Sequence, residues 1–235
     1  MKNIKTKEIW QNQNNKYTYV TLVCSNNYLY GAIGLGLSLR YTNAKYPLIV
    51  IVTDNVTNYK ELEKFNIEYY LVPYCETGNK KDYSFTINKL YAFNLVNYNK
   101  FLFLDADLIC YKNLDYILEE KNPYYFVAHI PYKSYHEWSK IWGGIFAAIP
   151  NYGFINKYIS NPNYIDDEDI LTKEFYNPTY LSYFHRNDIE WNVFHDNNMP
   201  HFHTEMKYWN KEYLDTPEKI TKYIKDFISN EKWKE

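Results

Sequence analysis

Hydrophobic and polar positions follow two different periods along this chain. Short apolar runs rich in β-branched and aromatic side chains predict strands, and apolar residues spaced three or four positions apart predict helices. The expected strands lie at 17–23, 47–53, 67–73, 100–104, 124–130 and 142–150. The expected helices lie at 28–41, 59–65, 84–96, 114–119, 152–160, 170–176 and 216–233.

The order of these elements indicates the fold class. Strands alternate with helices through short connections, which is typical of right-handed crossovers in a parallel sheet covered on both faces. The sequence therefore predicts an α/β protein, and its 235 residues are expected to form a single domain. The amphipathic helix at 216–233, with Thr216 as its cap, is expected to cover the core of that same domain.

One stretch carries candidate chemistry: residues 100–110 are Lys-Phe-Leu-Phe-Leu-Asp-Ala-Asp-Leu-Ile-Cys. Apolar residues run directly into Asp105 and Asp107, and α/β sheets bind ligands beyond the carboxyl ends of their strands. Because side chains alternate along a strand, the two carboxylates are expected to project to the same side. They would repel each other unless their pKa values shift or a hard divalent cation lies between them. The alternative is a solvated loop with two unrelated aspartates.

Charge and composition narrow the classes of partner. The formal net charge of -2 gives no basic field for nucleic acid. Aromatic residues make up 20% of the chain, and 28 residues are tyrosines. Such rings could stack on sugars or bases, but the codon bias of an A/T-rich genome, such as that of a virus or a parasite, is the favoured explanation.

The cysteines and the apolar runs indicate the compartment. Cys24, Cys75 and Cys110 are far apart and odd in number, so they form neither a disulfide framework nor a metal-binding spacing. Residues 1–15 are polar and lack the apolar core of a signal peptide, and the run at 48–52 is too short to cross a bilayer. A cytoplasmic protein without membrane insertion is therefore expected.

The common phosphate-binding fingerprints are missing from the sequence. No Gly-x-Gly-x-x-Gly follows the first strand, and no Gly-Lys-Ser/Thr occurs, so a bound nucleotide would need its phosphates held in another way. Lys89, in the helix before the Asp105 strand, could point at the site, although a helix lysine more often faces solvent. The four acids at 166–169 suit a helix start, but they exceed what a cap requires.

Several segments together resemble glycosyltransferase family 8, the group that includes glycogenins and galactinol synthases. The resemblance covers 17–209 in the order that the family has. Its Asp-x-Asp motif is matched closely at 103–108, and 201–209 keeps the spacing of His-x-x-Gly-x-x-Lys-Pro-Trp. Further similar segments lie at 21–32, 88–90, 143–146, 167–171 and 191–192.

This resemblance implies a GT-A fold, with a Rossmann-like, mixed, mostly parallel sheet flanked by helices. It implies a metal-dependent enzyme that retains anomeric configuration. Such an enzyme would move a hexosyl unit from UDP-glucose, UDP-galactose or UDP-GlcNAc to a hydroxyl of a glycan, a protein or a small polyol. Whether the chain forms a homodimer stays open.

The resemblance also implies roles for single residues. Asp105, Asp107 and His201 would hold Mn²⁺, with Mg²⁺ as the alternative ion, and Lys207 would stabilise the leaving diphosphate. Asp167 would face the anomeric carbon, either as a nucleophile or as a steadying charge. The donor would contact Leu22, Ser25, Tyr28, Lys89, Asp105, Ala106, Asp107, Gly143, Gly144, Glu168, Asn192, His201, Thr204 and Lys207, of which the first three would hold uracil.

The chain departs from the family pattern at several positions. Asp166, Asp167 and Asp169 compete for one acidic position, and Asp167 is chosen because the apolar pair at 170–171 then aligns. No tyrosine lies between Asn192 and His201, which argues against self-priming of the glycogenin kind. Threonine stands for the family's glycine at 204, tyrosine for proline at 208, glutamate for glutamine at 168, and Trp-Gly for Asn-Ser at 142–143.

Two rival functions follow from these features. The altered positions 142 and 204 leave open a non-catalytic module that binds sugar nucleotides or glycans. A metal-dependent phosphotransferase or nucleotidyltransferase would also use paired aspartates, but it would leave the segment at 201–209 without a purpose. A hexosyltransferase explains the whole set of motifs.

Overall fold

A computed structural model gives the fold of the chain. It describes residues 16–78, 83–110, 112–128, 141–159, 161, 163–175 and 217–229. The strands are β1 (Tyr17–Val23), β2 (Leu48–Thr53), β3 (Glu68–Val72), β4 (Lys100–Leu104), β5 (Tyr125–Ala128) and β6 (Ile141–Ala148). The α-helices are α1 (Leu29–Tyr41), α2 (Glu61–Lys64), α3 (Asp115–Glu119), α4 (Asp167–Phe175) and α7 (Pro217–Ser229). The 3-10 helices are η1 (Asn26–Tyr28), η2 (Ser84–Asn94) and η3 (Phe154–Lys157).

The strands of the described residues form one six-stranded sheet in the order β3-β2-β1-β4-β6-β5. Neighbours in the β3-β2-β1-β4 part are parallel, whereas β6 runs antiparallel to both β4 and β5. The parallel part follows from the strand-helix-strand order, since each crossover returns the chain to the same end of the sheet. The predicted mixed, mostly parallel sheet is therefore confirmed.

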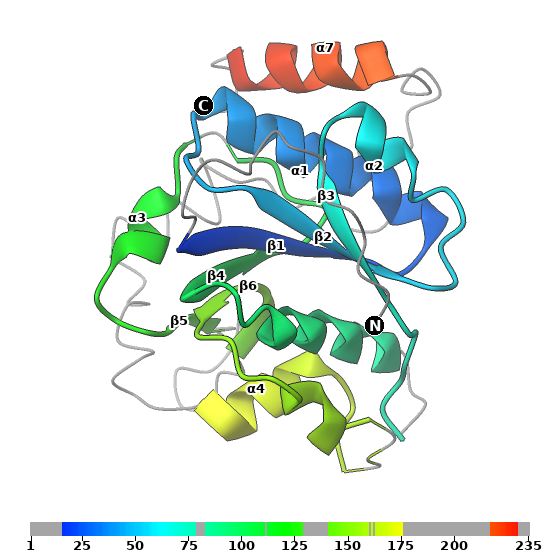
Figure 1. The fold of residues 1–235 in the computed structure, drawn as a ribbon, viewed down its shortest axis with the longest axis vertical. Coiled ribbons are helices and arrows are strands. Elements are labelled where there is room, and N and C mark those ends of the chain that lie inside the picture. Colours follow the sequence, from blue (N-terminus) through cyan, green and yellow to red (C-terminus); the bar gives the residue numbers. More distant parts are fainter. Residues whose placement is uncertain are drawn as a thin grey trace, which may run out of the picture.

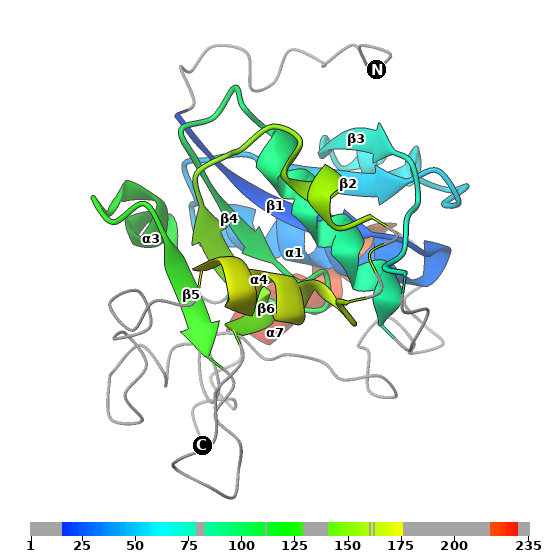
Figure 2. The same ribbon diagram turned by 90° about the horizontal axis from the view of Figure 1, so that it is seen from below.

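Helices cover both faces of this sheet, and α1 lies on one face while η2 and α4 lie on the other (Figures 1 and 2). Side chains of β1 alternate between the two cores: Tyr19 and Val23 pack towards α1, and Val20 and Leu22 pack towards η2. All six residues of β2 are buried, as expected of a strand that is covered on both faces.

Helix α7 forms an outer layer on α1 (Figure 1). Its Ile220 is fully buried and belongs to the same core cluster as Ile33 of α1. The described helix covers 217–229 of the expected span of 216–233, and residues 216 and 230–233 lie outside the described residues. No helix of the described residues is both long and apolar enough to span a membrane.

The residues that follow β4 differ from the sequence-based expectation of an extended strand end. The strand ends at Leu104, and Asp105 to Asp107 form a turn in which the Leu108 amide donates to the Asp105 carbonyl at 3.2 Å. The alternation of an extended strand therefore does not apply to the two aspartates. The Asp105 amide still donates to the Gly144 carbonyl at 2.8 Å, so the turn stays attached to β6.

Candidate active site

A buried lysine holds together three elements beyond the carboxyl end of β4. The Lys89 Nζ lies 2.9 Å from Asp105 Oδ1 and 3.4 Å from Asp167 Oδ2, and it donates to the Gly143 carbonyl at 3.1 Å. These partners come from the turn after β4, from the start of α4 and from β6. Only 11% of the Lys89 side chain is exposed, so the structure rejects the alternative of a solvated helix lysine.

The charge of Lys89 follows from its surroundings. Burial alone would lower the pKa of Lys89, but the carboxylates of Asp105 and Asp167 outweigh this effect and raise it above its ordinary value. The side chain is therefore a permanent ammonium. It holds two carboxylates from different parts of the chain close together, which would otherwise repel each other.

Gly143 is the point where β6 meets the first turn of α4. Its amide donates to Glu168 Oε1 at 3.1 Å, while its carbonyl accepts from Lys89. A Cβ atom at this position would lie 1.9 Å from Asp167 Oδ2 and 2.9 Å from Asp167 Cγ. Glycine is therefore required because the buried Asp167 carboxylate fills the space of a side chain.

Strand β6 pairs irregularly with β5 near these glycines. The register of the pairing shifts between Phe126 and Val127 of β5. A Cβ atom on the next glycine, Gly144, would lie 2.4 Å from the Trp142 ring. Both glycines thus allow close approach of a side chain. The approaching groups are an acid and an indole of the same chain.

The acids at 166–169 have separate tasks. Asp166 Oδ1 accepts the Asp169 amide at 2.9 Å, and Asp169 Oδ2 accepts the Ile165 amide at 3.0 Å, so both carboxylates cap the start of α4. Asp167 is 2% exposed and faces Lys89. Of the three aspartates that compete for the family's acidic position, Asp167 is the one that the structure places in the cluster.

Glu168 carries an unusual carboxyl group. Its burial and the charge of Asp167 raise its pKa to about 7, although the Gly143 amide and Lys89 act in the opposite direction. The group therefore exchanges protons near neutral pH, and it lies against the same glycine as Lys89.

The residues expected to hold uracil lie at the carboxyl end of β1 and in η1. Leu22 is buried within the strand, and the Ser25 carbonyl accepts the Tyr28 amide at 3.1 Å. Burial, together with the charges of Asp107 and Asp105, raises the pKa of Tyr28 to about 12. Tyr28 therefore lies within electrostatic range of the acidic turn, as a shared donor site requires.

Two supporting residues had no role in the sequence analysis. Thr86 Oγ1 accepts the Asp167 amide at 3.3 Å, so η2 helps to fix the start of α4. The fully buried Asn88 side chain accepts the Cys75 amide at 3.1 Å and donates to the Cys75 carbonyl at 2.7 Å. Asn88 lies in the segment at 88–90 that resembles the family, but no role followed from this, and Thr86 gave no signal.

The acidic turn has the chemistry of a cation site. Asp107 is 6% exposed, Ala106 between the two aspartates is 4% exposed, and carboxylate oxygens are the ligands that hard divalent ions prefer. Among the described residues, no group of three acidic, histidine or cysteine side chains is arranged to hold a metal ion. The expected third ligand, His201, lies outside the described residues, as do Asn192, Thr204 and Lys207.

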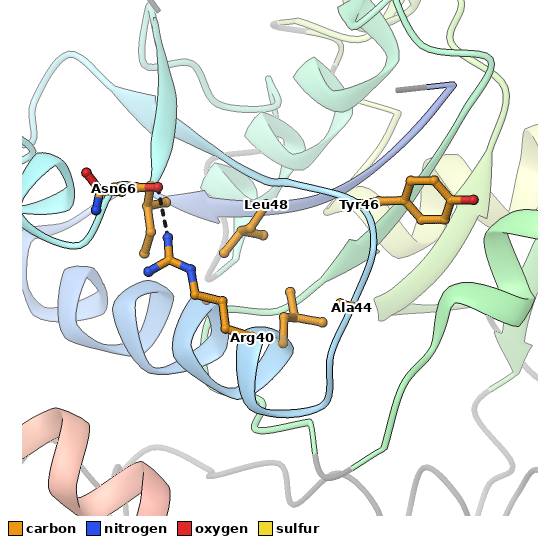
Figure 3. A pocket seen from close by; sticks show the side chains of 8 residues that line it. Arg40, Ala44, Tyr46, Leu48 and Asn66 are labelled. Atoms are coloured by element: carbon orange, nitrogen blue, oxygen red, sulfur yellow. Dashed lines mark hydrogen bonds between the residues drawn. The ribbon is translucent and has the colours of Figure 1, made fainter. Parts of the chain in front are cut away.

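A separate pocket lies at the amino-terminal end of β2. The acidic turn lies beyond the carboxyl ends of the parallel strands, so the two are at opposite ends of these strands. Its empty volume is about 300 Å³, including space open to solvent. Figure 3 shows Arg40 reaching across it to the Asn66 carbonyl, to which it donates at 2.8 Å. None of the eight residues that line it is acidic, so it lacks the groups expected of the predicted site.

The sheet order, the helices on both faces and the acidic turn after β4 define a fold of the GT-A type. Solved glycosyltransferases share it. WbbM, a bifunctional glycosyltransferase, matches with a TM-score of 0.57 and 16% identity over 94% of this chain and 51% of that chain. The galactosyltransferase LgtC, solved with donor and acceptor sugar analogues, matches with a TM-score of 0.56 and 13% identity over 92% of this chain and 99% of that one.

Relatives in sequence confirm the resemblance to glycosyltransferase family 8. An uncharacterized protein of Acanthamoeba polyphaga mimivirus is 35% identical over 129 residues, which are 49% of this chain and 45% of that protein. Galactinol synthase 1 of Ajuga reptans is 31% identical over 47% of this chain and 36% of its own length. Glycogenin-1 of Homo sapiens is 28% identical over 44% of this chain and 32% of its own length. The chain thus spans less than half of these relatives, and no protein-family model matches it.

Proposed function

We propose that this protein is a metal-dependent, retaining hexosyltransferase. It would move a hexosyl unit from a UDP-sugar, namely UDP-glucose, UDP-galactose or UDP-GlcNAc, to the hydroxyl of a glycan, a protein or a small polyol. The observation that carries the proposal is the buried cluster in which Lys89 joins Asp105 of the acidic turn to Asp167 of α4. This cluster brings together two segments that the family resemblance assigns to the donor.

The cluster suits glycosyl transfer because charge develops when the bond between sugar and phosphate breaks. Mn²⁺ or Mg²⁺, held by Asp105, Asp107 and His201, would supply positive charge to the leaving diphosphate. Lys89 fixes the Asp105 carboxylate in place on the protein side. The preorganised charge then needs no rearrangement during the reaction.

We propose that Asp167 faces the donor sugar, and its place in the buried cluster with Lys89 supports this role. Lys89 Nζ lies 3.4 Å from Asp167 Oδ2, and the absence of a side chain at Gly143 leaves room for the carboxylate. An ionised carboxylate near the anomeric carbon would stabilise positive charge on the sugar ring or attack it directly. Lys207 would assist the leaving group, as the resemblance implies.

The names of the relatives support glycosyl transfer. Several are named as galactinol synthases, and others are a glycogenin and a putative glucuronosyltransferase that acts on xylan. A glycan, a protein and a small polyol are the acceptors that we propose to test, and the printed name of the xylan glucuronosyltransferase supports the first of them. The rival function is a module of the same fold that binds sugar nucleotides without turnover, favoured by Trp142 in place of the family's asparagine.

Calorimetric titration of UDP-sugars with and without Mn²⁺, followed by a hydrolysis assay, tests the proposal. At least one UDP-hexose should bind at least tenfold more tightly with Mn²⁺ and should be hydrolysed slowly. Asp107→Asn should abolish the effect of Mn²⁺ because it removes a ligand charge. The matched control, Asp226→Asn on the exposed side of α7, should leave it unchanged. Binding without any turnover supports the module, and an Asp107→Asn variant that keeps full metal-dependent activity refutes the proposed metal site.

A further inference from the structure

The charges of the cluster do not balance among the described residues. Asp105, Asp167 and Glu168 all lie within electrostatic range of the Lys89 ammonium. When all three are ionised, they bring three negative charges to one positive charge. A divalent cation on the acidic turn would act mainly on the Asp105 side, because Asp105 and Asp107 form that turn. The α4 side, with Asp167 and Glu168, keeps its negative character.

Glu168 and Lys89 both form a hydrogen bond with the backbone of Gly143. The Gly143 amide donates to Glu168 Oε1 at 3.1 Å, and the carbonyl of the same residue accepts from Lys89 at 3.1 Å. One oxygen of Glu168 is thus fixed by the backbone of β6. Its position is built into the junction of β6 with α4 and does not depend on a mobile surface side chain.

The sequence puts a carboxylate where the resembling family has an amide. Glutamine and glutamate have nearly the same shape, so the exchange keeps the contact with the Gly143 amide. It adds a negative charge beside Asp167, however. The consequence is electrostatic, and it falls on any charged group that a donor sugar brings to this side of the site.

We propose that Glu168 is a specificity-determining residue that restricts the donor to sugars without a carboxylate. This inference rests on the proposed function. A uronic acid carries an ionised carboxylate at C6, where the matching hexose carries a neutral hydroxymethyl group. Like charges in a partly buried site repel strongly, so the uronic acid donor is rejected while the hexose donor is accepted.

The proton affinity of Glu168 supports this inference and adds a second signature. The groups that face Glu168 are Asp166 and Asp167 of its own helix, Lys89 of η2 and the Gly143 amide of β6. Because the pKa of Glu168 is about 7, the side chain is mostly neutral at pH 6 and mostly charged at pH 8. The uronic acid stays ionised throughout, so discrimination against it should increase with pH over this interval.

The experiment compares donors that differ only at C6. Affinities with Mn²⁺ are measured for UDP-glucose against UDP-glucuronate, and for UDP-galactose against UDP-galacturonate, at pH 6 and pH 8. The natural chain should prefer the hexose by at least tenfold at pH 8 and by less at pH 6. Glu168→Gln should reduce this preference about tenfold at pH 8 and make it independent of pH. Glu174→Gln, the same change at an exposed position of α4, is the matched control and should keep the preference.

The outcomes separate the inference from the proposed function. Equal affinity of the natural chain for hexose and uronic acid donors overturns the inference alone. So does a preference that Glu168→Gln leaves unchanged while thermal unfolding shows that the variant is folded. Failure to bind any of the four UDP-sugars or UDP-GlcNAc overturns the proposed function and this inference with it.

Discussion

A methyl group at position 143 is the sharpest test of how the candidate site is built. In the structure, a Cβ atom there would lie 1.9 Å from Asp167 Oδ2. Asp167 is 2% exposed, and Lys89 lies 3.4 Å from the same oxygen. Gly143→Ala therefore forces the carboxylate away from its ammonium or moves β6 away from α4.

The cost of this change has two parts. Overpacking a filled core typically costs about 1–3 kcal/mol. Loss of the hydrogen bond from the Gly143 amide to Glu168 adds about 1 kcal/mol. The free energy of unfolding should thus fall by about 2–4 kcal/mol. For a chain of this size, that corresponds to a decrease in Tm of roughly 4–16 °C.

Urea unfolding of a double-mutant cycle is the assay. In an Asp167→Ala background the obstructing carboxylate is gone, so Gly143→Ala should cost no more than about 0.5 kcal/mol, and the coupling energy should be about 2–4 kcal/mol. Gly36→Ala on α1 is the control, because its Cβ would meet the flexible end of Ile67 at 2.7 Å and helix propensity favours alanine. An equal cost of Gly143→Ala in both backgrounds would refute the reasoning.

Three further predictions concern charge and packing. Lys89→Met should lower the free energy of unfolding by about 3–5 kcal/mol, because it leaves buried carboxylates without their cation. The control, Lys64→Met, removes an exposed ion pair and should cost less than about 1 kcal/mol in the same urea titration. The pKa of Glu168 is raised from 4.5 to about 7, so its contribution to stability is present below pH 4.5 and is lost as the pH rises through 7. Glu168→Gln should therefore gain about 1–2 kcal/mol relative to the natural chain between pH 5 and pH 8 in thermal melts, and a constant difference would contradict this account. Ile220→Ala should lower the free energy of unfolding by about 2–5 kcal/mol, because this side chain of α7 is buried in the core. The exposed Lys222→Ala should cost less than about 0.5 kcal/mol, and equal Tm values for the two variants would argue against a structural role for α7.

Much of the fold was predictable because its signals are local. A buried strand such as β2 needs a continuous aliphatic run, and a helix such as α1 needs apolar residues at helical spacing, so both patterns are visible in the chain. The alternation of strands and helices then determined the parallel part of the sheet. The paired aspartates after β4 were visible for the same reason, since a motif of neighbouring residues needs no tertiary contact to be recognised.

The tertiary structure decided which side chains meet. A lysine in a helix is usually solvated, and only the packing of η2 against β4, β6 and α4 reveals that Lys89 is buried among carboxylates. The conformation of Asp105 to Asp107 was likewise not visible in the sequence, because these residues form a turn whose Asp105 amide donates to the Gly144 carbonyl of β6.

The sequence by itself thus determined the elements, their order and the acidic motif, because hydrophobic periodicity and neighbouring residues encode them. The sequence already favoured Asp167 among three aspartates, and the tertiary structure showed that Asp167 lies beside Lys89 while the other two cap α4. It also explained Gly143, whose missing side chain is replaced by a carboxylate from a distant part of the chain. Contacts of this kind depend on distances between elements, and no local pattern contains them.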